Sequence, residues 1–473
     1  MRDYASYPEY DENRARECAQ AFEEMLVTNR SGYLDIFQVD EIFHFYIEAS
    51  DFRKAQQLID FAFQSHPSSS DLHHKKAGLE FEMAHYENAL THINQALLLQ
   101  PLQVEYLLFK SEILAHLDKY DDGIELLERA LIYATDATEV YMQMGHIAQV
   151  CGRLEESEEF FRQVLAEKTD SEDALFELAL ILENRKRNGN YQEAIQLYNS
   201  FLDANPHSEF AWYNVGILYA KSQLFEEAYE AFDFATAIKD DFASAHFNKG
   251  RVLMYQEDYK SAVQSFMEVL SLEKNDKMTC YHIGECYDYL EMPKEALRYY
   301  LKAAELGSDM SDAYIGIGGC LEELEKFTEA IHYYEKALKI DPENTEILLS
   351  IAICEYKLGN LTGAYRYLEF AIHKNPNNLN IWKDWAILLY DNGNITGALT
   401  FLEEGIKVNT LSADLYYLSA VYYMDLGKKS RSLTMLENAL LLDYKGHEEV
   451  LPLFPDYMAN PNVQQLLKQY KKK

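Results

Sequence analysis

A small residue recurs along this chain at a nearly constant interval of 34 residues, and this periodicity limits the fold more than any other feature. Only the step from Ser157 to Ala194, at 37 residues, departs from the interval. The recurring residues are Ala55, Ala89, Gly123, Ser157, Ala194, Ala228, Ala262, Ala296, Ala330, Ala364, Ala398 and Ser432. A fixed period of this length predicts an array of stacked units in place of separate globular domains.

Two further positions in each period usually carry small residues. One lies twelve residues before the recurring residue, as Gly250 does before Ala262, and the other lies seven residues after it, as Ala337 does after Ala330. Paired helices approach to about 8–10 Å only where small side chains face the neighbouring helix. We therefore expect these positions to mark helix crossings, with large side chains filling the space between them. The aromatic fillers are Phe161, Tyr198, Phe232, Phe266, Tyr300 and Tyr334.

Glycine and proline mark the ends of the expected helices. Gly152, Gly359 and Gly393 stand between two helices of a unit, where a residue with positive φ ends the first helix. Prolines twelve residues past the recurring small residue end the second helix, because proline has no amide proton and cannot continue a helix. These prolines are Pro67, Pro101, Pro206, Pro342 and Pro376.

The combined pattern resembles the tetratricopeptide repeat. The segments AWYNVGILYAKSQLFEEAYEAFDFATAI (211–238) and TEAIHYYEKALKIDPEN (328–344) match its consensus, and the resemblance extends over about residues 36–446. The resemblance implies an all-α fold, a right-handed α-solenoid (superhelix) of about twelve helix-turn-helix units with capping helices.

The repeat divides the chain into a cap, an array and a second cap. We expect an N-terminal capping helix within 1–35, at about residues 12–28, and a C-terminal cap and basic tail at 447–473. A solenoid needs such caps because its terminal units would otherwise expose their apolar faces. The twelve tandem units of 36–446 are expected at 36–69, 70–103, 104–137, 138–171, 172–208, 209–242, 243–276, 277–310, 311–344, 345–378, 379–412 and 413–446.

Composition argues against several classes of function. The 43 Lys and Arg against 78 Asp and Glu give a net charge of −35, which repels nucleic-acid phosphates and anionic lipid headgroups. No stretch approaches about 18 uninterrupted apolar residues, and the 6 cysteines form no CxxC pair. We therefore expect a cytoplasmic protein that neither binds nucleic acid nor inserts into a membrane. No phosphate-binding or catalytic motif occurs, which predicts no enzyme activity, no cofactor and no metal site.

Three of the cysteines, Cys286, Cys320 and Cys354, recur at one position of the repeat. Their spacing places them on consecutive first helices. We interpret them as small, slightly apolar residues that pack between neighbouring helices, and a redox role is the alternative.

The resemblance also implies where a partner would bind. In similar proteins the first helices of successive units line a concave face that receives an extended peptide or a helix. Three residues before the small position of the first helix lies a set of apolar and aromatic residues, here named the ladder: Leu108, Met142, Phe176, Tyr213, Phe247, Tyr281, Ile315, Leu349 and Tyr417. Asn214 and Asn248 match a consensus asparagine that hydrogen-bonds the backbone of a bound peptide in similar proteins. Packing is the alternative for the ladder, since the consensus itself favours tyrosine there.

An acidic column runs beside the ladder, six residues before the small position: Asp71, Glu105, Glu139, Asp173, Asp312, Glu346 and Asp414. An acid in the first turn of a helix is stabilised by the helix dipole, by about 0.3–1 kcal/mol, which explains the column locally. The same side chains are also expected to make the inner surface negative, together with residues such as Glu285 and Asp288. A basic partner segment would be attracted to such a surface.

These observations predict a non-catalytic scaffold or adaptor that binds a partner protein segment, expected to be basic, along an acidic and aromatic concave groove. The alternative is a regulatory or sensor subunit that controls an enzyme or a transcription or signalling partner through effector-dependent closure. Self-association is also open. The candidate partner-binding residues are Glu139, Asp173, Phe176, Tyr213, Asn214, Phe247, Asn248 and Tyr281.

Overall fold

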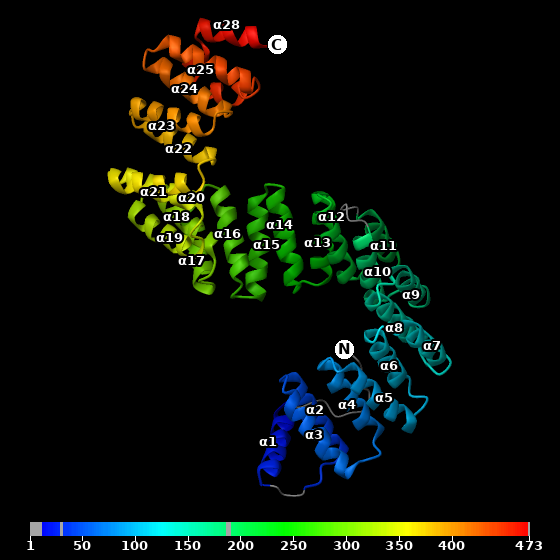
Figure 1. Cartoon of the computed structure of the whole chain (residues 1–473). Helices are drawn as coiled ribbons and strands as arrows, with labels where there is room; N and C mark the ends of the chain where they lie inside the picture. The colour runs from blue at the N-terminus through cyan, green and yellow to red at the C-terminus, as the bar shows by residue number, and fades with distance from the viewer. Residues whose placement is uncertain (1–11, 29–31, 186–190, 472–473) are drawn as a thin grey trace. The chain divides into compact units, whose positions relative to one another are not determined.

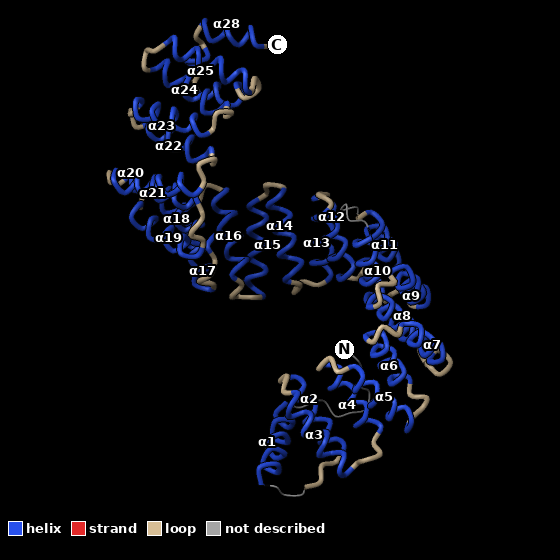
Figure 2. The backbone as a smooth tube through the Cα atoms, viewed as in Figure 1, coloured by secondary structure: helices blue, strands red, loops and turns tan. Residues whose placement is uncertain are grey.

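The computed structural model describes residues 12–28, 32–185 and 191–471, and the fold of this part is all-α. Figure 2 shows helices joined by short loops, and no strand occurs within these ranges. The helices form two compact units, residues 1–238 and 239–473. The expected all-α solenoid is thus confirmed.

In the first unit, α1 precedes a series of helix pairs in which each helix packs against the next (Figure 1). The helices are α1 (Glu12–Thr28), α2 (Ile36–Glu48), α3 (Phe52–Ser65), α4 (Ser70–Glu82), α5 (Tyr86–Leu99), α6 (Val104–His116), α7 (Tyr120–Ala130), α8 (Ala137–Val150), α9 (Leu154–Glu167), α10 (Glu172–Arg185), α11 (Gln192–Ala204), α12 (Glu209–Lys221) and α13 (Phe225–Ile238). Even-numbered helices are the first, and odd-numbered helices the second, of each pair.

The second unit continues the same alternation, with α14, α15 and α16 lying side by side (Figure 1). Its paired helices are α14 (Ala243–Tyr255), α15 (Tyr259–Leu272), α16 (Lys277–Tyr289), α17 (Pro293–Leu306), α18 (Ser311–Glu323), α19 (Phe327–Ile340), α20 (Thr345–Lys357), α21 (Leu361–Lys374), α22 (Leu379–Asp391), α23 (Ile395–Val408), α24 (Ala413–Asp425) and α25 (Lys429–Leu442). The short α26 (His447–Val450), a 3₁₀ turn (Leu451–Leu453), α27 (Pro455–Met458) and α28 (Pro461–Tyr470) follow.

Glycines of the first helices lie against the buried aromatic rings of the second helices. A Cβ atom on Gly145 would lie 2.4 Å from Cε1 of Phe161, whose side chain is fully buried. Only a residue without a side chain permits this contact, because carbon atoms do not approach so closely. The same relation joins Gly216 to Phe232, Gly250 to Phe266, Gly284 to Tyr300 and Gly318 to Tyr334.

Each turn inside a pair that the structure describes has one residue with positive φ. The expected glycines adopt it, with φ of 72° at Gly152, 79° at Gly359 and 78° at Gly393. Other pairs place an ordinary residue in the same conformation, for example Ala84 at 58°. The helix pair therefore imposes the turn geometry, and glycine only lowers the conformational free energy that this geometry costs.

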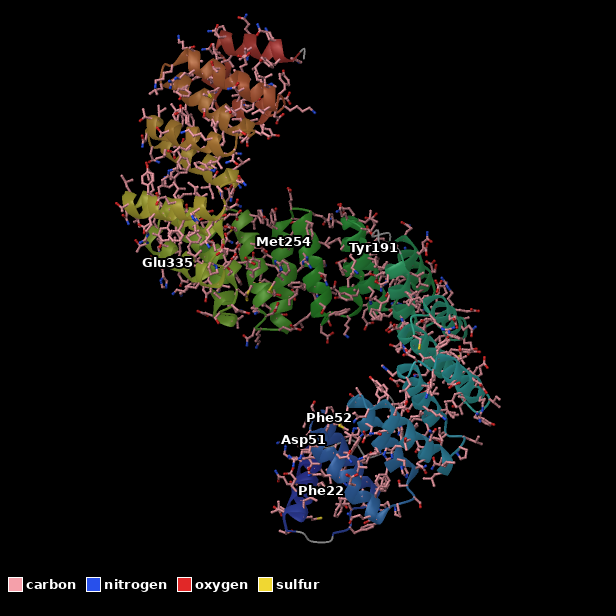
Figure 3. All side chains as sticks on the ribbon, viewed as in Figure 1. Phe22, Asp51, Phe52, Tyr191, Met254 and Glu335 are labelled. Carbon is pink, nitrogen blue, oxygen red and sulfur yellow. The ribbon has the colours of Figure 1, made fainter. Side chains whose placement is uncertain are left out.

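Second helices end where the prolines predict. For example, α19 ends at Ile340, one residue before the C-cap Asp341 and two before Pro342. Some helix starts are stabilised by side-chain caps: the carboxylate of Asp51, labelled in Figure 3, accepts a hydrogen bond of 3.1 Å from the Lys54 amide at the start of α3. Pro293, which is early in a second helix, is the first residue of α17, where its missing amide proton costs nothing.

Helix α1, which precedes the pairs, covers the pair α2–α3. Phe22, labelled in Figure 3, is fully buried, and its ring lies 5.5 Å from that of Phe61 in an edge-on contact. The Tyr46 hydroxyl donates to Glu23 at 3.1 Å. The span of α1 coincides with the expected 12–28, while residues 1–11 and 29–31 of the predicted cap segment lie outside the described part.

The C-terminal helices cover the last pair of the array. Val463 of α28 is fully buried and Leu467 nearly so, in one apolar core with residues of α24 and α25. The Tyr457 hydroxyl lies 3.2 Å from Oγ of Ser432, one of the recurring small residues. The region is broken into short helices because prolines stand at their first turns.

Candidate protein-binding site

In the first unit, three of the candidate residues are exposed on first helices. Glu139 of α8 and Asp173 of α10 are exposed in the first turns of their helices. Phe176 is 37% exposed, although its ring also packs edge-on against Phe210 with centroids 5.9 Å apart. Its helix therefore presents an aromatic and an acidic side chain one turn apart.

Tyr213 and Asn214 of α12 are half-buried. The ring of Tyr213 lies 5.9 Å from that of Phe232, so part of its surface belongs to the core. The side-chain amide of Asn214 donates a hydrogen bond of 2.8 Å to the carbonyl oxygen of Phe210, one turn earlier in its own helix. A peptide that used this amide as a donor would compete with that internal bond.

In the second unit, Phe247 and Asn248 of α14 repeat this arrangement. The ring of Phe247 lies 5.6 Å from Phe266 and 5.5 Å from His282. The Asn248 side chain donates to the carbonyl oxygen of Ser244 at 3.1 Å. These aromatic residues therefore have the packing role that the repeat consensus suggests, whatever further contact they make with a partner.

Three members of the ladder are buried, and the expectation that they face a groove is wrong for them. Leu108 is 6% exposed and Leu349 is 7% exposed. Tyr417 is fully buried, and its hydroxyl donates to the carbonyl oxygen of Asp443 at 2.6 Å. Tyr417 lies in the core that includes the C-terminal helices, so the cap covers this end of the ladder.

Residues of the ladder and of the acidic column line the same cavity in the second unit, which has a volume of about 310 Å³. Its walls are Tyr281, Glu285, Asp288 and Tyr289 of α16, Tyr300 of α17, and Asp312, Ile315 and Gly316 of α18. Tyr300 is only 3% exposed and forms the buried wall. A Cβ atom on Gly316 would lie 2.7 Å from the Tyr300 ring, so glycine is what lets α18 approach it. Tyr281 is thus the one candidate residue that lies in this cavity.

Hydrogen bonds fix the position of one cavity acid, Glu285. The Tyr281 hydroxyl donates to its Oε1 at 3.0 Å, and Nδ1 of His282 lies 2.7 Å from its Oε2. Partial burial, followed by the negative charges of Glu323 and Glu285, raises the pKa of Asp288. Burial, together with the charge of Glu285, also raises the pKa of Tyr281, so its hydroxyl stays protonated and remains a donor.

The acids of the column differ in their partners. Asp71 accepts from Lys75 at 2.8 Å, and Lys383 donates to Asp414 at 2.7 Å. Within the described ranges Asp312, the cavity member of the column, has no such ion pair. Of these three column acids, Asp71 and Asp414 are therefore neutralised by a lysine, and Asp312 at the cavity is not.

The three recurring cysteines lie in the buried interior of the described helices. Cys286, Cys320 and Cys354 are buried between helices, and burial raises the pKa of each thiol, to about 12 for Cys286 and Cys320. A protonated, buried thiol is a packing group. Nowhere in residues 12–28, 32–185 and 191–471 do three or more His, Cys, Asp or Glu side chains gather as metal ligands. Each helix in these ranges is too short or too polar to cross a bilayer.

Helix pairs with small residues at their crossings define a helical-repeat protein. Models of the tetratricopeptide repeat match residues 74–138, 143–209 and 184–239, residues 243–276 and 279–307, and residues 311–344. Together these matches cover more than half of the chain. The chain therefore belongs to the tetratricopeptide repeat family.

Several solved structures are similar. YrrB, described as a TPR protein with an unusual peptide-binding site, is 23% identical, with 40% of this chain and 98% of YrrB covered and a TM-score of 0.37. A tetratricopeptide repeat protein from Parabacteroides merdae is 18% identical, with 56% and 99% covered and a TM-score of 0.43. MamA is 18% identical, with 37% and 96% covered and a TM-score of 0.36. No curated protein matches the sequence.

The repeat pattern did not predict which residues form the cavity. Glu285 and Asp288 were expected on an acidic surface, and Tyr300 as a core filler, but nothing joined them to Tyr289 or Gly316. The available signal was a second glycine, Gly316, two residues before the recurring small position Gly318. Its role depends on the ring of Tyr300, which lies against both Gly284 and Gly316.

Proposed function

We propose that this protein is a non-catalytic scaffold that binds a basic segment of a partner protein along the acidic and aromatic side chains of its first helices. Tetratricopeptide repeats generally mediate protein–protein interaction, and this supports the coarser part of the proposal. The proposal includes a cytoplasmic location, as expected from the sequence, and it is compatible with self-association.

One observation supports the choice of a basic segment bound by acidic and aromatic side chains: an aromatic residue of the ladder and an acid of the column line the same cavity. Tyr281 and Asp312 come from consecutive first helices, α16 and α18. Aromatic surface gives contact area at low entropic cost, and carboxylates attract a cation. In the first unit, Phe176 and Asp173 of α10 offer the same two side-chain types on an exposed face.

The test is affinity capture from the native cell lysate with the full-length chain and two variants. Asn214→Ala combined with Asn248→Ala removes both candidate peptide-binding amides. Asn392→Ala is the control, because this amide also donates to a carbonyl one turn earlier, at 2.8 Å, but lies outside the candidate site. Circular dichroism and thermal melting establish that all three chains fold alike.

The proposal expects a specific partner that the wild type and Asn392→Ala retain and the double variant loses. Equal capture by all three would mean that the partner binds elsewhere on the chain. Capture of no protein would favour the regulatory alternative, in which an effector closes the array and no partner segment lies along it.

A further inference from the structure

The cavity formed by α16, α17 and α18 has a chemical character that identifies the kind of side chain it accepts. Glu285, Asp288 and Asp312 supply three carboxylates, and no lysine or arginine is among its walls. Within the described ranges, neither Asp288 nor Asp312 is paired with a cation of the chain. Carboxylates that crowd together without a counter-ion repel each other, and an external cation would relieve that repulsion.

Two acids comparable with those of the cavity are paired with lysines of the chain. Asp309, which lies just before α18, accepts from Lys277 at 3.2 Å. Asp414, at the register of Asp312 three pairs further on, is bound by Lys383. The chain thus supplies lysines to Asp309 and Asp414, whereas in the described ranges it supplies none to Asp288 or Asp312.

The aromatic walls favour a flat cation. Tyr289 is 64% exposed although one face of its ring stacks on Tyr259, with centroids 4.7 Å apart and planes 8° from parallel. Its other face is open to a guanidinium group, which stacks on aromatic rings and donates to carboxylates through a rigid fork. Glu285 is already held by Tyr281 and His282, so it needs little ordering before it accepts.

The volume of the cavity also favours a single side chain as its occupant. A cavity of about 310 Å³ is at the lower end of the roughly 300–1,000 Å³ that small-molecule sites occupy. It suits one long side chain, while the backbone that carries this side chain passes outside.

We propose that this cavity binds an arginine side chain projecting from the partner's segment. The proposal rests on the proposed function, because it assumes that a protein segment lies along the first helices. It adds the residue type that the segment must carry and the place at which that residue is held.

The experiment uses the full chain and fluorescein-labelled peptides of alternating glycine and arginine, glycine and lysine, or glycine and citrulline. Binding is measured by fluorescence anisotropy at about 0.15 M salt, where the Debye length of about 8 Å screens distant charges. Asp312→Asn removes one cavity charge. Glu346→Gln is the matched control, since Glu346 is exposed, occupies the same register one pair later and is not a wall of the cavity.

The proposal expects the arginine peptide to bind more tightly than the lysine peptide, and citrulline to bind weakest. Asp312→Asn is expected to weaken arginine binding about five- to tenfold, and Glu346→Gln less than about twofold. Tyr289→Leu, which removes the ring, is expected to reduce the preference for arginine over lysine.

Equal losses in Asp312→Asn and Glu346→Gln would overturn the proposal, because they would show attraction by the overall charge alone. Equal binding of arginine and lysine peptides by the wild type would overturn the choice of arginine. If no peptide binds while lysate capture still yields a partner sensitive to Asn214 and Asn248, the cavity proposal fails and the scaffold proposal stands.

Discussion

At the scale of single residues, the fold depends on contacts between a glycine and a ring. Gly250 of α14 faces Phe266 of α15, and its hypothetical Cβ would lie 2.7 Å from ring carbon Cε1. Phe266 is fully buried, so the ring has no space into which to move. The repeat therefore needs glycine here for reasons of volume, although glycine lowers the intrinsic stability of a helix.

Gly250→Ala is expected to destabilise the protein by about 1–3 kcal/mol through overpacking. Gly78→Ala provides the opposite case, because no atom lies within 4 Å of the added Cβ in the middle of α4. This second change is expected to stabilise the protein by about 0.5–1 kcal/mol through helix propensity alone. Urea denaturation measures both, and two changes of the same sign would contradict the packing assigned to Phe266.

Asp288 provides a test of the cavity's electrostatics. Its pKa is raised in the folded state, so the folded protein binds this proton more tightly than the unfolded chain does. Its negative charge is therefore destabilising at neutral pH, and the penalty disappears as pH falls through the raised pKa. Asp288→Asn is expected to raise Tm at pH 7, with a gain that vanishes in acid.

Asp309→Asn is the control of opposite sign. A hydrogen bond from Lys277 lowers the pKa of Asp309, so its charge stabilises the fold above the ordinary pKa of aspartate and that contribution is lost as pH falls. This variant should lower Tm at pH 7 and match the wild type in acid. A pH-independent shift in either variant would mean that the charge is not the cause.

At the scale of elements, each helix pair whose turn is described has one turn residue in the left-handed region. Glycine adopts this conformation at little cost, whereas other residues pay about 1 kcal/mol. The pair α4–α5 has Ala84 there at a φ of 58°, and the pair α20–α21 has Gly359 at 79°. The same geometry thus occurs with and without the residue that suits it.

Ala84→Gly is expected to raise stability, by up to about 1 kcal/mol, and Gly359→Ala to lower it by a similar amount. No atom lies within 4 Å of a Cβ on Gly359, so the loss would come from the backbone alone. Thermal melting of both variants measures the effect. A stabilising Gly359→Ala would refute the left-handed turn.

Periodicity predicted the helices well because each helix end follows from local chemistry. Pro342 ends one helix and Gly359 ends the next through their own backbone properties. Exposure along the ladder was less predictable. Phe176 and Tyr417 occupy the same register, yet the first is 37% exposed and the second is fully buried, because the C-terminal helices cover it. A repeat pattern describes an average unit and carries no information about what lies beyond its ends.

At the scale of the whole molecule, the central claim is that a partner contacts the first helices and not the second. The charge of −35 attracts basic segments from a distance, but it does not select a face. Selection must come from local groups such as Tyr281, Asp312 and Tyr289 around the cavity. The claim therefore concerns one face and is open to direct mapping.

The most direct measurement is photo-crosslinking with p-benzoylphenylalanine, incorporated at one aromatic position at a time, in the native lysate. Tyr289 of the first helix α16 is 64% exposed, and Phe370 of the second helix α21 is 58% exposed, so the two positions are matched in accessibility. The account predicts a discrete crosslinked partner from position 289, competed by the arginine peptide, and none from position 370. Crosslinking from 370 alone would contradict it and assign binding to the second helices.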